Sequence, residues 1–369
     1  MEKGTVPFLP GNAMRQFHKL TVQRLENETA DSMRVALRVP DNLQGQFEFL
    51  PGQHLPIQIT LDGKKIRRTY SICSTPGQGQ LELGIRVQPG GQFSGFVAGE
   101  LAVGDELDVM PPFGQFHAQP DPAKICDYLA FAAGSGITPI LSIIRSTLES
   151  EPGSRFVLFY GNRLQRTTMF IDDIYALKNR FPERLQLCFL FSQEEQEFPI
   201  FSGRLDAEKV RELYGKFCGG LEPAEAFVCG PDTMIETVSA TLKDLGLDPD
   251  LIHVERYGVP RRSGRPPPAA EAESGHDTNV TVIMDGHRKS FSMASKGLSI
   301  VDAAAREGIE LPYSCKGGVC ATCRTHVREG EVQMETNYGL EPWEVEQGYV
   351  LACQSRPLSQ QLVLDYDKT

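Results

Sequence analysis

Hydrophobic and polar residues alternate in short runs over the first third of the chain. In Met33–Val39 and Leu81–Val87, apolar side chains recur at every second position, which is typical of strands with one buried face. Turn signals separate these runs, and they are Pro51-Gly52, Pro76-Gly77 and Pro89-Gly90-Gly91. The pattern predicts an antiparallel β-barrel over residues 1–120.

After residue 120 the pattern changes to apolar strands that alternate with amphipathic helices. The expected strands are Tyr128–Ala132, Phe156–Tyr160, Leu185–Phe191 and Phe227–Cys229, and the expected helices lie near Pro139–Ser150, Met169–Asn179 and Asp232–Leu245. Alternation of this kind predicts a doubly wound α/β unit with a parallel sheet over residues 121–258.

A segment with a different composition follows. Residues 259–277 contain four prolines and almost no bulky apolar side chain, so they predict an extended linker. Residues 278–369 then mix short strands with one helix near Val301–Glu307, which indicates a small α+β, β-grasp-like domain. A domain of this size usually needs a disulfide or a metal centre for stability.

Composition narrows the classes of function. Of the 369 residues, 37 are Lys or Arg and 48 are Asp or Glu, so the net charge of −11 argues against nucleic-acid binding and against docking on anionic lipid. No secretory signal is visible, and the longest uncharged stretch, Tyr128–Ile144, is interrupted by Gly, Ser, Thr and Pro. Nine unevenly placed cysteines favour a reducing, cytoplasmic location.

Four cysteines of the C-terminal segment have a characteristic spacing. The C-x4-C-x2-C run with one distant cysteine is formed by Cys315, Cys320, Cys323 and Cys353. This spacing is typical of a plant-type [2Fe–2S] cluster, and Gly317 and Gly318 let the loop fold closely around it. A zinc site is the alternative, although zinc motifs usually pair two short-spaced doublets. The scattered Cys73, Cys126, Cys188 and Cys218 are expected to be small buried side chains.

Two motifs of the barrel indicate a flavin site. Arg68, Tyr70 and Ser71 stand at the end of an expected strand, and Gly91 and Ser94 open an expected short helix. An arginine and a helix N-terminus can bind a pyrophosphate, and an aromatic side chain can cover the flavin ring. The alternative is an ordinary strand end with a salt-bridged arginine. None of the seven histidines forms a spaced cluster, and His54 is expected to be a strand residue rather than a base.

Three segments of the α/β unit indicate a nucleotide site. Gly134, Gly136 and Thr138 follow one strand, and Cys229, Gly230 and Pro231 follow another. Ligands of doubly wound sheets bind at the carboxyl ends of the strands, so these segments should meet in one crevice. Arg163 and Arg166 follow a third strand and are candidates for binding a ribose 2′-phosphate, which would favour NADPH over NADH. Solvated surface arginines are the equal alternative.

Together these motifs resemble the ferredoxin–NADP reductase superfamily, and the C-terminal cysteine pattern resembles its oxygenase-type reductases. The more specific segments resemble the reductase subunits of bacterial phenylacetyl-CoA epoxidases; they are Tyr160–Arg163 with Met169-Phe170, Gly203–Asp206, Leu311–Cys323 and Met334–Pro342.

The resemblance implies site roles. Arg68, Tyr70 and Ser71 would hold the flavin, with Ser71 near its reactive nitrogen. The remaining roles are pyrophosphate binding by Gly91 and Ser94, flavin or nicotinamide contact by Thr138, and a nicotinamide pocket shaped by Gly134, Gly136, Cys229, Gly230 and Pro231. Glu255 and Tyr257 match the superfamily's Glu-x-aromatic sequence beside the flavin. Ser71, Cys229 and Glu255 are therefore the candidate catalytic residues.

The resemblance also implies an activity. Electrons would pass from NADPH to FAD, then to the [2Fe–2S] cluster, and then to a di-iron oxygenase component in phenylacetate catabolism. FMN and NADH are the alternatives to FAD and NADPH. Two other functions remain open: a reductase for a hybrid-cluster protein or a Rieske-type oxygenase, and a redox-sensing or binding module without turnover.

Overall fold

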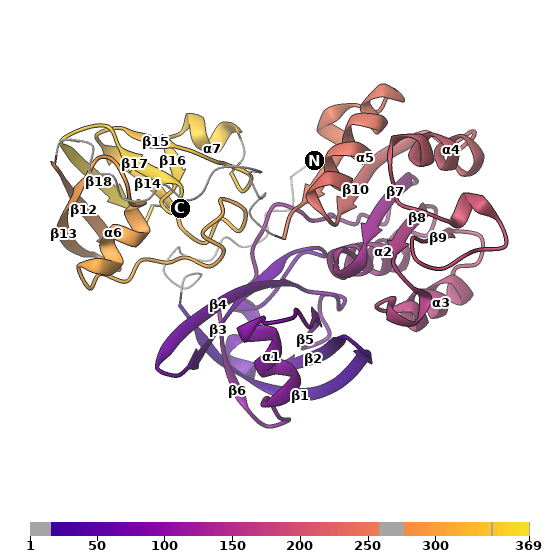
Figure 1. The fold of residues 1–369 in the computed structure, drawn as a ribbon, viewed down its shortest axis with the longest axis horizontal. Helices are drawn as coiled ribbons and strands as arrows, with labels where there is room; N and C mark the ends of the chain where they lie inside the picture. The colour runs from indigo at the N-terminus through magenta and orange to yellow at the C-terminus, as the bar shows by residue number, and fades with distance from the viewer. Residues whose placement is uncertain (1–15, 258–276, 341, 369) are drawn as a thin grey trace.

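The computed structural model describes residues 16–257, 277–340 and 342–368, and its strands form three main sheets (Figure 1). The predicted linker therefore lies outside the described residues, apart from Asp277, which begins a strand. Within the described ranges, no helix combines the length and the hydrophobicity needed to cross a membrane.

The first sheet is the antiparallel barrel that the alternating pattern predicts. Its strands are β1 (His18–Thr29), β2 (Ser32–Arg38), β3 (His54–Leu61), β4 (Lys64–Ser71), β5 (Gln80–Arg86) and β6 (Glu106–Val109), in the order β4-β3-β6-β1-β2-β5. A bridge between Ile72 and Leu83 joins the two outer strands. A short 3-10 helix spans Asp41–Gln46, and helix α1 spans Gln92–Gly99. Phe93 and Val97 of α1 pack into the apolar interior of the barrel.

The second sheet is parallel, as predicted. Its strands are β7 (Asp127–Ala133), β8 (Arg155–Asn162), β9 (Leu185–Phe191), β10 (Pro223–Cys229) and β11 (Ile252–Glu255), in the order β11-β10-β7-β8-β9. Helices α2 (Ile137–Ser150) and α3 (Ile171–Arg180) share one apolar core, whereas α4 (Ala207–Phe217) and α5 (Asp232–Asp244) share the other. The sheet is therefore covered on both faces, which makes the unit doubly wound (Figure 1).

Two elements of this unit are absent from the sequence-based prediction. The apolar residues of helix α4 do have the spacing of an amphipathic helix, so the sequence held a signal that the prediction did not use; they are Val210, Leu213, Tyr214 and Phe217. Strand β11 has four residues, too few to show a reliable alternation. Helix α2 also begins at Ile137, two residues before Pro139, because proline is tolerated in the first turn of a helix.

The third sheet belongs to the C-terminal unit and is mixed. It contains β12 (Asp277–Met284), β13 (His287–Ala294), β14 (Arg324–Glu329), β16 (Tyr349–Leu351) and β18 (Gln361–Asp365), in the order β13-β12-β18-β14-β16. Strands β15 (Val332–Met334) and β17 (Ser355–Pro357) form a separate pair. The helices are α6 (Ile300–Arg306) and α7 (Pro342–Glu346). Parallel pairing of β12 with β18 within an otherwise antiparallel sheet, packed against α6, gives the expected α+β architecture.

Candidate flavin, nucleotide and iron–sulfur sites

The hydroxyl of Tyr257 joins the barrel to the parallel-sheet unit. It lies 3.1 Å from Ser71 Oγ at the end of β4 and 2.8 Å from Thr138 Oγ1 in the first turn of α2. The Tyr257 side chain is 43% exposed, although its hydroxyl is enclosed by these partners. Three predicted site residues from three distant parts of the chain therefore meet at one point.

Cys229 and Glu255 lie beside this point. They are paired in register on the neighbouring strands β10 and β11, and the Cys229 side chain is fully buried. Burial raises the pKa of the Cys229 thiol well above its usual value, and the nearby Glu255 carboxylate raises it further. A hydrogen bond with Tyr257 acts in the opposite direction on this pKa, but burial dominates. Cys229 is therefore a neutral thiol in contact with the Tyr257 hydroxyl.

His54 is a site residue that sequence reasoning missed. It begins β3, as expected for a strand residue, but its Nδ1 lies 3.3 Å from Glu255 Oε1 of the other unit. Both side chains are buried, and the Phe113 ring packs edge-on against the imidazole at 4.7 Å between centroids. A lone histidine in a strand gives no sequence signal for such a partner, because the contact exists only once the two units pack together.

Close backbone packing explains the glycines of the predicted nucleotide site. A Cβ at Gly136 would lie 2.2 Å from the carbonyl oxygen of Cys229, so only glycine fits between the two strand ends. Gly134 has a positive φ of 55°, and a Cβ at Gly230 would meet the Met234 side chain at 2.8 Å. Gly136 precedes α2 and Pro231 precedes α5, and neither end has a side-chain cap. Two helix N-termini with uncapped N–H groups thus meet at one sheet edge, which suits a phosphate-containing ligand.

The predicted flavin residues also lie together. The ring of Tyr70 packs against Phe93 of α1 at 5.2 Å between centroids. Gly91 precedes α1 without a side-chain cap, while Ser94 Oγ accepts a hydrogen bond from the Gln88 N–H at 3.1 Å. Arg68 is exposed and donates to the carbonyl of Arg67 at 2.7 Å. An aromatic ring beside an uncapped helix N-terminus has the chemistry that a flavin and its pyrophosphate require.

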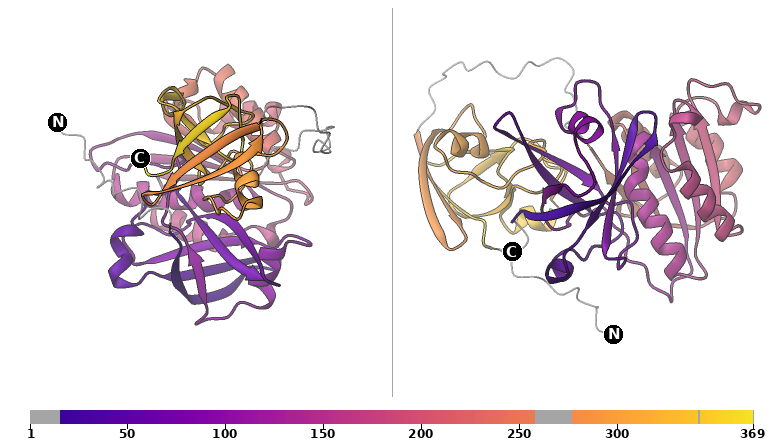
Figure 2. Two further views of the ribbon diagram at one scale, coloured as in Figure 1. Left: turned by 90° about the vertical axis from the view of Figure 1, so that its left-hand side faces the viewer. Right: turned by 90° about the horizontal axis from the view of Figure 1, so that it is seen from below.

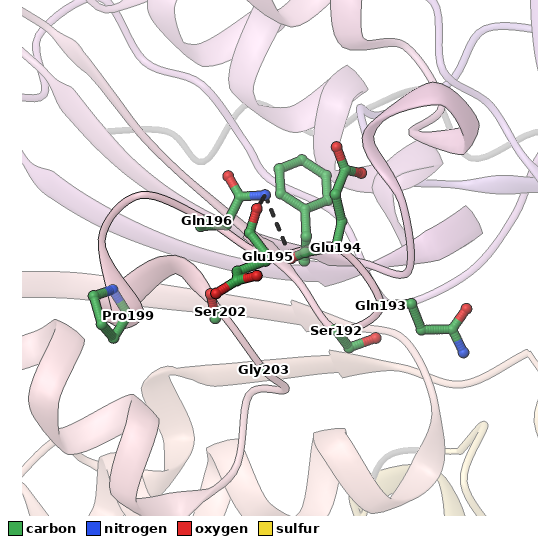
Figure 3. Close-up of a pocket in the computed structure, with 9 residues that line it drawn as sticks. Ser192, Gln193, Glu194, Glu195, Gln196, Pro199, Ser202 and Gly203 are labelled. Carbon is green, nitrogen blue, oxygen red and sulfur yellow. Dashed lines mark hydrogen bonds between the residues drawn. The ribbon is translucent and has the colours of Figure 1, made fainter.

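Arg163 and Arg166 are exposed in the segment after β8, at the same edge of the sheet, and Arg166 lies in a short 3-10 helix, Gln165–Thr167. The carboxyl end of β9, the next strand along the chain, borders a cavity of about 380 Å³ (Figure 3). Its lining residues are Phe191, Ser192, Gln193, Glu194, Glu195, Gln196, Pro199, Ser202 and Gly203. The Gln193 N–H donates to the Arg163 carbonyl at 2.9 Å, and the Gln165 N–H donates to Glu194 Oε2 at 2.7 Å. The arginine loop and the cavity are therefore adjacent.

The four cysteines of the C-terminal unit form two pairs. The Cys320 N–H donates to Cys315 Sγ at 3.4 Å, and the Cys353 N–H donates to Cys323 Sγ at 3.5 Å. A further N–H, from Gly317, donates to Cys315 Sγ at 3.2 Å. Gly318 has a positive φ of 76°, and a Cβ there would meet the Thr336 carbonyl oxygen at 2.8 Å. The loop thus closes tightly around the sulfur atoms, as the sequence predicts.

The two thiols of each pair differ in pKa. A hydrogen bond from Cys320, followed by backbone N–H groups, lowers the pKa of Cys315 to about 5, and a hydrogen bond from Cys323 lowers the pKa of Cys353. The pKa values of Cys320 and Cys323 are raised well above the usual value by these same hydrogen bonds and by burial. In the described ranges, no three ligand side chains converge on a single point in the way one metal ion requires. Two cysteine pairs suit a binuclear centre, in which each iron takes two thiolates, better than one tetrahedral zinc ion.

Comparison with known families agrees with this arrangement. Residues 19–118 match an oxidoreductase FAD-binding domain, residues 131–240 match an oxidoreductase NAD-binding domain, and residues 282–358 match a 2Fe-2S iron-sulfur cluster binding domain. The fold and its sites therefore define an oxidoreductase that transfers electrons from a pyridine nucleotide through FAD to a [2Fe–2S] cluster.

Relatives that match over nearly their whole length define the family. The chain is 42% identical to a component of the 1,2-phenylacetyl-CoA epoxidase of Escherichia coli (strain K12), over 96% of this chain and 99% of the relative. It is 32% identical to the ferredoxin reductase component of 3-ketosteroid-9-alpha-monooxygenase from Rhodococcus rhodochrous, over 94% and 96% of the two chains. The solved structure of phthalate dioxygenase reductase has the same fold, with a TM-score of 0.57, 22% identity and coverage of 95% and 98%. The chain belongs to the ferredoxin–NADP reductase superfamily, in the family that includes this component of the phenylacetyl-CoA epoxidase.

Proposed function

We propose that this protein is the reductase component of a di-iron oxygenase that epoxidises the ring of phenylacetyl-CoA. The observation that carries this proposal is the 42% identity to the phenylacetyl-CoA epoxidase component, over nearly the full length of both chains. Reductase components of steroid and glycine betaine monooxygenases are less similar, at 32% and 28% identity. The unit boundaries that we propose are residues 1–120 for the flavin, 121–258 for the nucleotide and 278–369 for the cluster.

In this proposal the flavin lies against β4 and α1. Bound FAD supplies the ability to accept two electrons together and to release them one at a time. Arg68 and the N-terminus of α1, with Gly91 and Ser94, bind its pyrophosphate. Tyr70 covers the ring, and Ser71 orients it through the hydroxyl that also contacts Tyr257.

The nicotinamide pocket lies where the barrel meets the parallel sheet. Gly134, Gly136, Gly230 and Pro231 would shape this pocket. Gly136 and Gly230 pack closely against the Cys229 carbonyl and the Met234 side chain. Thr138 and Cys229 position the nicotinamide ring as neutral hydrogen-bonding groups, and Glu255 supplies the nearby negative charge. Tyr257 contacts Ser71 and Thr138 and would cover the flavin face that the nicotinamide must reach.

The proposal includes a preference for NADPH. Arg163 and Arg166 are exposed beside the cavity and can pair with a ribose 2′-phosphate. Glu194 and Glu195 line the same cavity and would instead accept hydrogen bonds from a ribose 2′-hydroxyl, as NADH requires. The balance between these arginines and carboxylates decides the preference for one coenzyme over the other.

Reconstitution tests the proposed acceptor. The purified protein, loaded with FAD and iron–sulfur cluster, is mixed with NADPH, phenylacetyl-CoA and the catalytic subunits of a phenylacetyl-CoA epoxidase. We expect NADPH-dependent epoxide formation, and no turnover when a 3-ketosteroid monooxygenase replaces the epoxidase. Reduction of the steroid enzyme instead would assign the protein to another oxygenase. A visible spectrum in which NADPH bleaches neither flavin nor cluster would indicate a module without turnover.

We also propose a cytoplasmic location, in keeping with nine cysteines that form no disulfide among the described residues.

A further inference from the structure

Strand β4 contacts the C-terminal unit with one face. Lys65, Arg67 and Thr69 alternate along the strand and therefore project from the same face. All three contact the segment from Glu310 to Ser314, which leads directly into the cluster ligand Cys315. The barrel that contains β4 and the C-terminal unit lie side by side in Figure 2.

Arg67 is the centre of this contact. Its side chain is only 6% exposed, and its Nε donates to Gln58 Oε1 within the barrel at 2.7 Å. Its guanidinium group pairs with the Glu310 carboxylate and lies over the Tyr313 ring, 4.8 Å from the centroid. A guanidinium group can use its donors and its flat faces at the same time, and here both are directed at the C-terminal unit.

Neighbouring residues extend the contact. Lys65 Nζ lies 2.9 Å from Glu310 Oε2, and the hydroxyls of Thr69 and Ser314 are 2.6 Å apart. Hydrogen bonding to Lys65, together with the Arg67 charge, lowers the pKa of Glu310, so this carboxylate stays charged at neutral pH. A separate contact places Arg256 over the ring of Tyr338, 5.1 Å from the centroid.

The opposite face of β4 belongs to the flavin region. Ile66 and Tyr70 pack toward the barrel interior, and Tyr70 meets Phe93 of α1. Thr69 precedes Tyr70 directly, and Ser314 precedes Cys315 directly. The strand therefore separates the cluster loop from Arg68 and Tyr70, whereas Ser71 follows Thr69 on the face that contacts the C-terminal unit.

We propose that Arg67 and Lys65 form a latch with Glu310 that holds the cluster loop against β4, in the position for electron transfer from the flavin. Arg67 and Glu310 are positioning residues that act through their side chains; Arg67 contacts the proposed flavin residue Arg68 through its backbone carbonyl. The latch is reversible, because Glu310 and Lys65 are both about half exposed and their attraction is screened by salt. Release would free the C-terminal unit to deliver electrons elsewhere, while Arg67 keeps Gln58 and the Phe17 ring as partners.

Cross-linking tests the position of the latch without any measurement of activity. A carbodiimide should join Lys65 to Glu310 in the loaded protein, and mass spectrometry of the peptides identifies the bond. The yield should be independent of protein concentration, as an intramolecular contact requires. Lys64, the exposed neighbour in β4, should form no bond to Glu310, and Lys65→Arg should abolish the product. Absence of the Lys65–Glu310 product, when acetylation shows Lys65 to be reactive, would overturn the latch.

Rapid mixing with NADPH tests its effect on electron transfer, which rests on the proposed flavin site. Flavin reduction should keep its rate in Arg67→Gln and Glu310→Gln, whereas subsequent cluster reduction should slow by about tenfold, the effect of losing one charge-assisted hydrogen bond. Arg67→Lys should restore much of the rate, and Glu307→Gln, an exposed acid nearby, should leave it unchanged.

A change in ionic strength gives a second, independent test of the latch. Increasing the ionic strength to about 0.5 M should slow cluster reduction in the unmodified protein more than in Glu310→Gln. Equal cluster-reduction rates in the unmodified protein and both latch variants, with equal FAD and iron contents, would overturn the proposal. Failure of the unmodified protein to reduce its flavin would instead contradict the proposed function, and would leave the cross-linking result standing.

Discussion

Cys229 is a fully buried thiol whose pKa lies well above its ordinary value. We expect Cys229→Ser to bind FAD and NADPH but to slow flavin reduction about 10- to 100-fold, because a small displacement of the nicotinamide is costly to hydride transfer. Rapid-mixing measurements at saturating NADPH check this rate. Cys188→Ala, at another buried strand cysteine, is the matched control and should leave the rate unchanged.

The pH dependence of flavin reduction distinguishes an effect of the position of the Cys229 thiol from an effect of its charge. A raised pKa keeps the Cys229 thiol protonated below about pH 9, the usual range of thiol titration, so its charge does not change between pH 6 and 9. The unmodified protein and Cys229→Ser should therefore show parallel pH profiles over this range. A rate equal to that of the unmodified protein would make Cys229 a packing residue only.

The second prediction for individual residues concerns Arg163 and Arg166 and the preference for NADPH. Replacing both with Ala should raise KM for NADPH by about 10- to 100-fold and change KM for NADH little, because only NADPH has a phosphate to pair. Steady-state kinetics with both coenzymes check it. Arg180→Ala is the control, since Arg180 ends α3 at the opposite edge of the sheet. Equal effects on the two coenzymes would show that neither arginine binds the phosphate.

At the scale of elements, we expect the close approach of the α2 N-terminus to β10 to determine both stability and NADPH binding. Gly136→Ala places a Cβ 2.2 Å from the Cys229 carbonyl oxygen, so the two strand ends must separate. We expect a loss of about 1–3 kcal/mol in unfolding free energy, together with weaker NADPH binding. Chemical denaturation and coenzyme titration measure both quantities.

A second glycine provides the control for this prediction. Gly215 lies within α4 and has no atom within 4 Å of the position a Cβ would take. Gly215→Ala should raise stability slightly, because alanine favours a helix interior, and should leave coenzyme binding unchanged. If Gly136→Ala bound NADPH normally, the close approach would not shape the nucleotide site.

At the scale of the whole molecule, the order of electron flow can be tested by removing the C-terminal unit. A protein truncated after Gly258 should keep NADPH-dependent ferricyanide reduction, because the residues proposed for flavin and nicotinamide binding all precede that position. It should lose delivery of electrons to the oxygenase. Cys353→Ser should behave in the same way if its unit remains folded without one of the proposed cluster ligands. FAD content must be measured in parallel, since Tyr257 lies next to the new terminus.

A specific result would contradict this order. If the shortened protein retained full FAD content and still drove the oxygenase, the cluster would not be on the path. Loss of FAD from the shortened protein would show that the C-terminal unit, whose latch lies on β4, also stabilises the flavin site.

The sequence by itself determined the secondary-structure classes and the chemistry of the local motifs. Alternation with a period of two indicated the barrel strands, and the C-x4-C-x2-C spacing placed three cysteines in one loop. These signals succeed because the residues that make them are neighbours in the chain. Helix α4 was missed although its apolar residues have the amphipathic spacing, whereas strand β11 has only four residues and gives a weak local pattern.

Only the tertiary structure decided which distant residues meet. His54 pairs with Glu255 across 201 positions of sequence, and Arg67 pairs with Glu310 across 243. Tyr257 likewise joins Ser71 to Thr138. No local pattern encodes these pairs: the motifs named Ser71, Thr138, Glu255 and Tyr257 as site residues, but they did not say which side chains touch. They form because the burial of apolar faces packs the three units together, and that packing fixes which polar groups face one another.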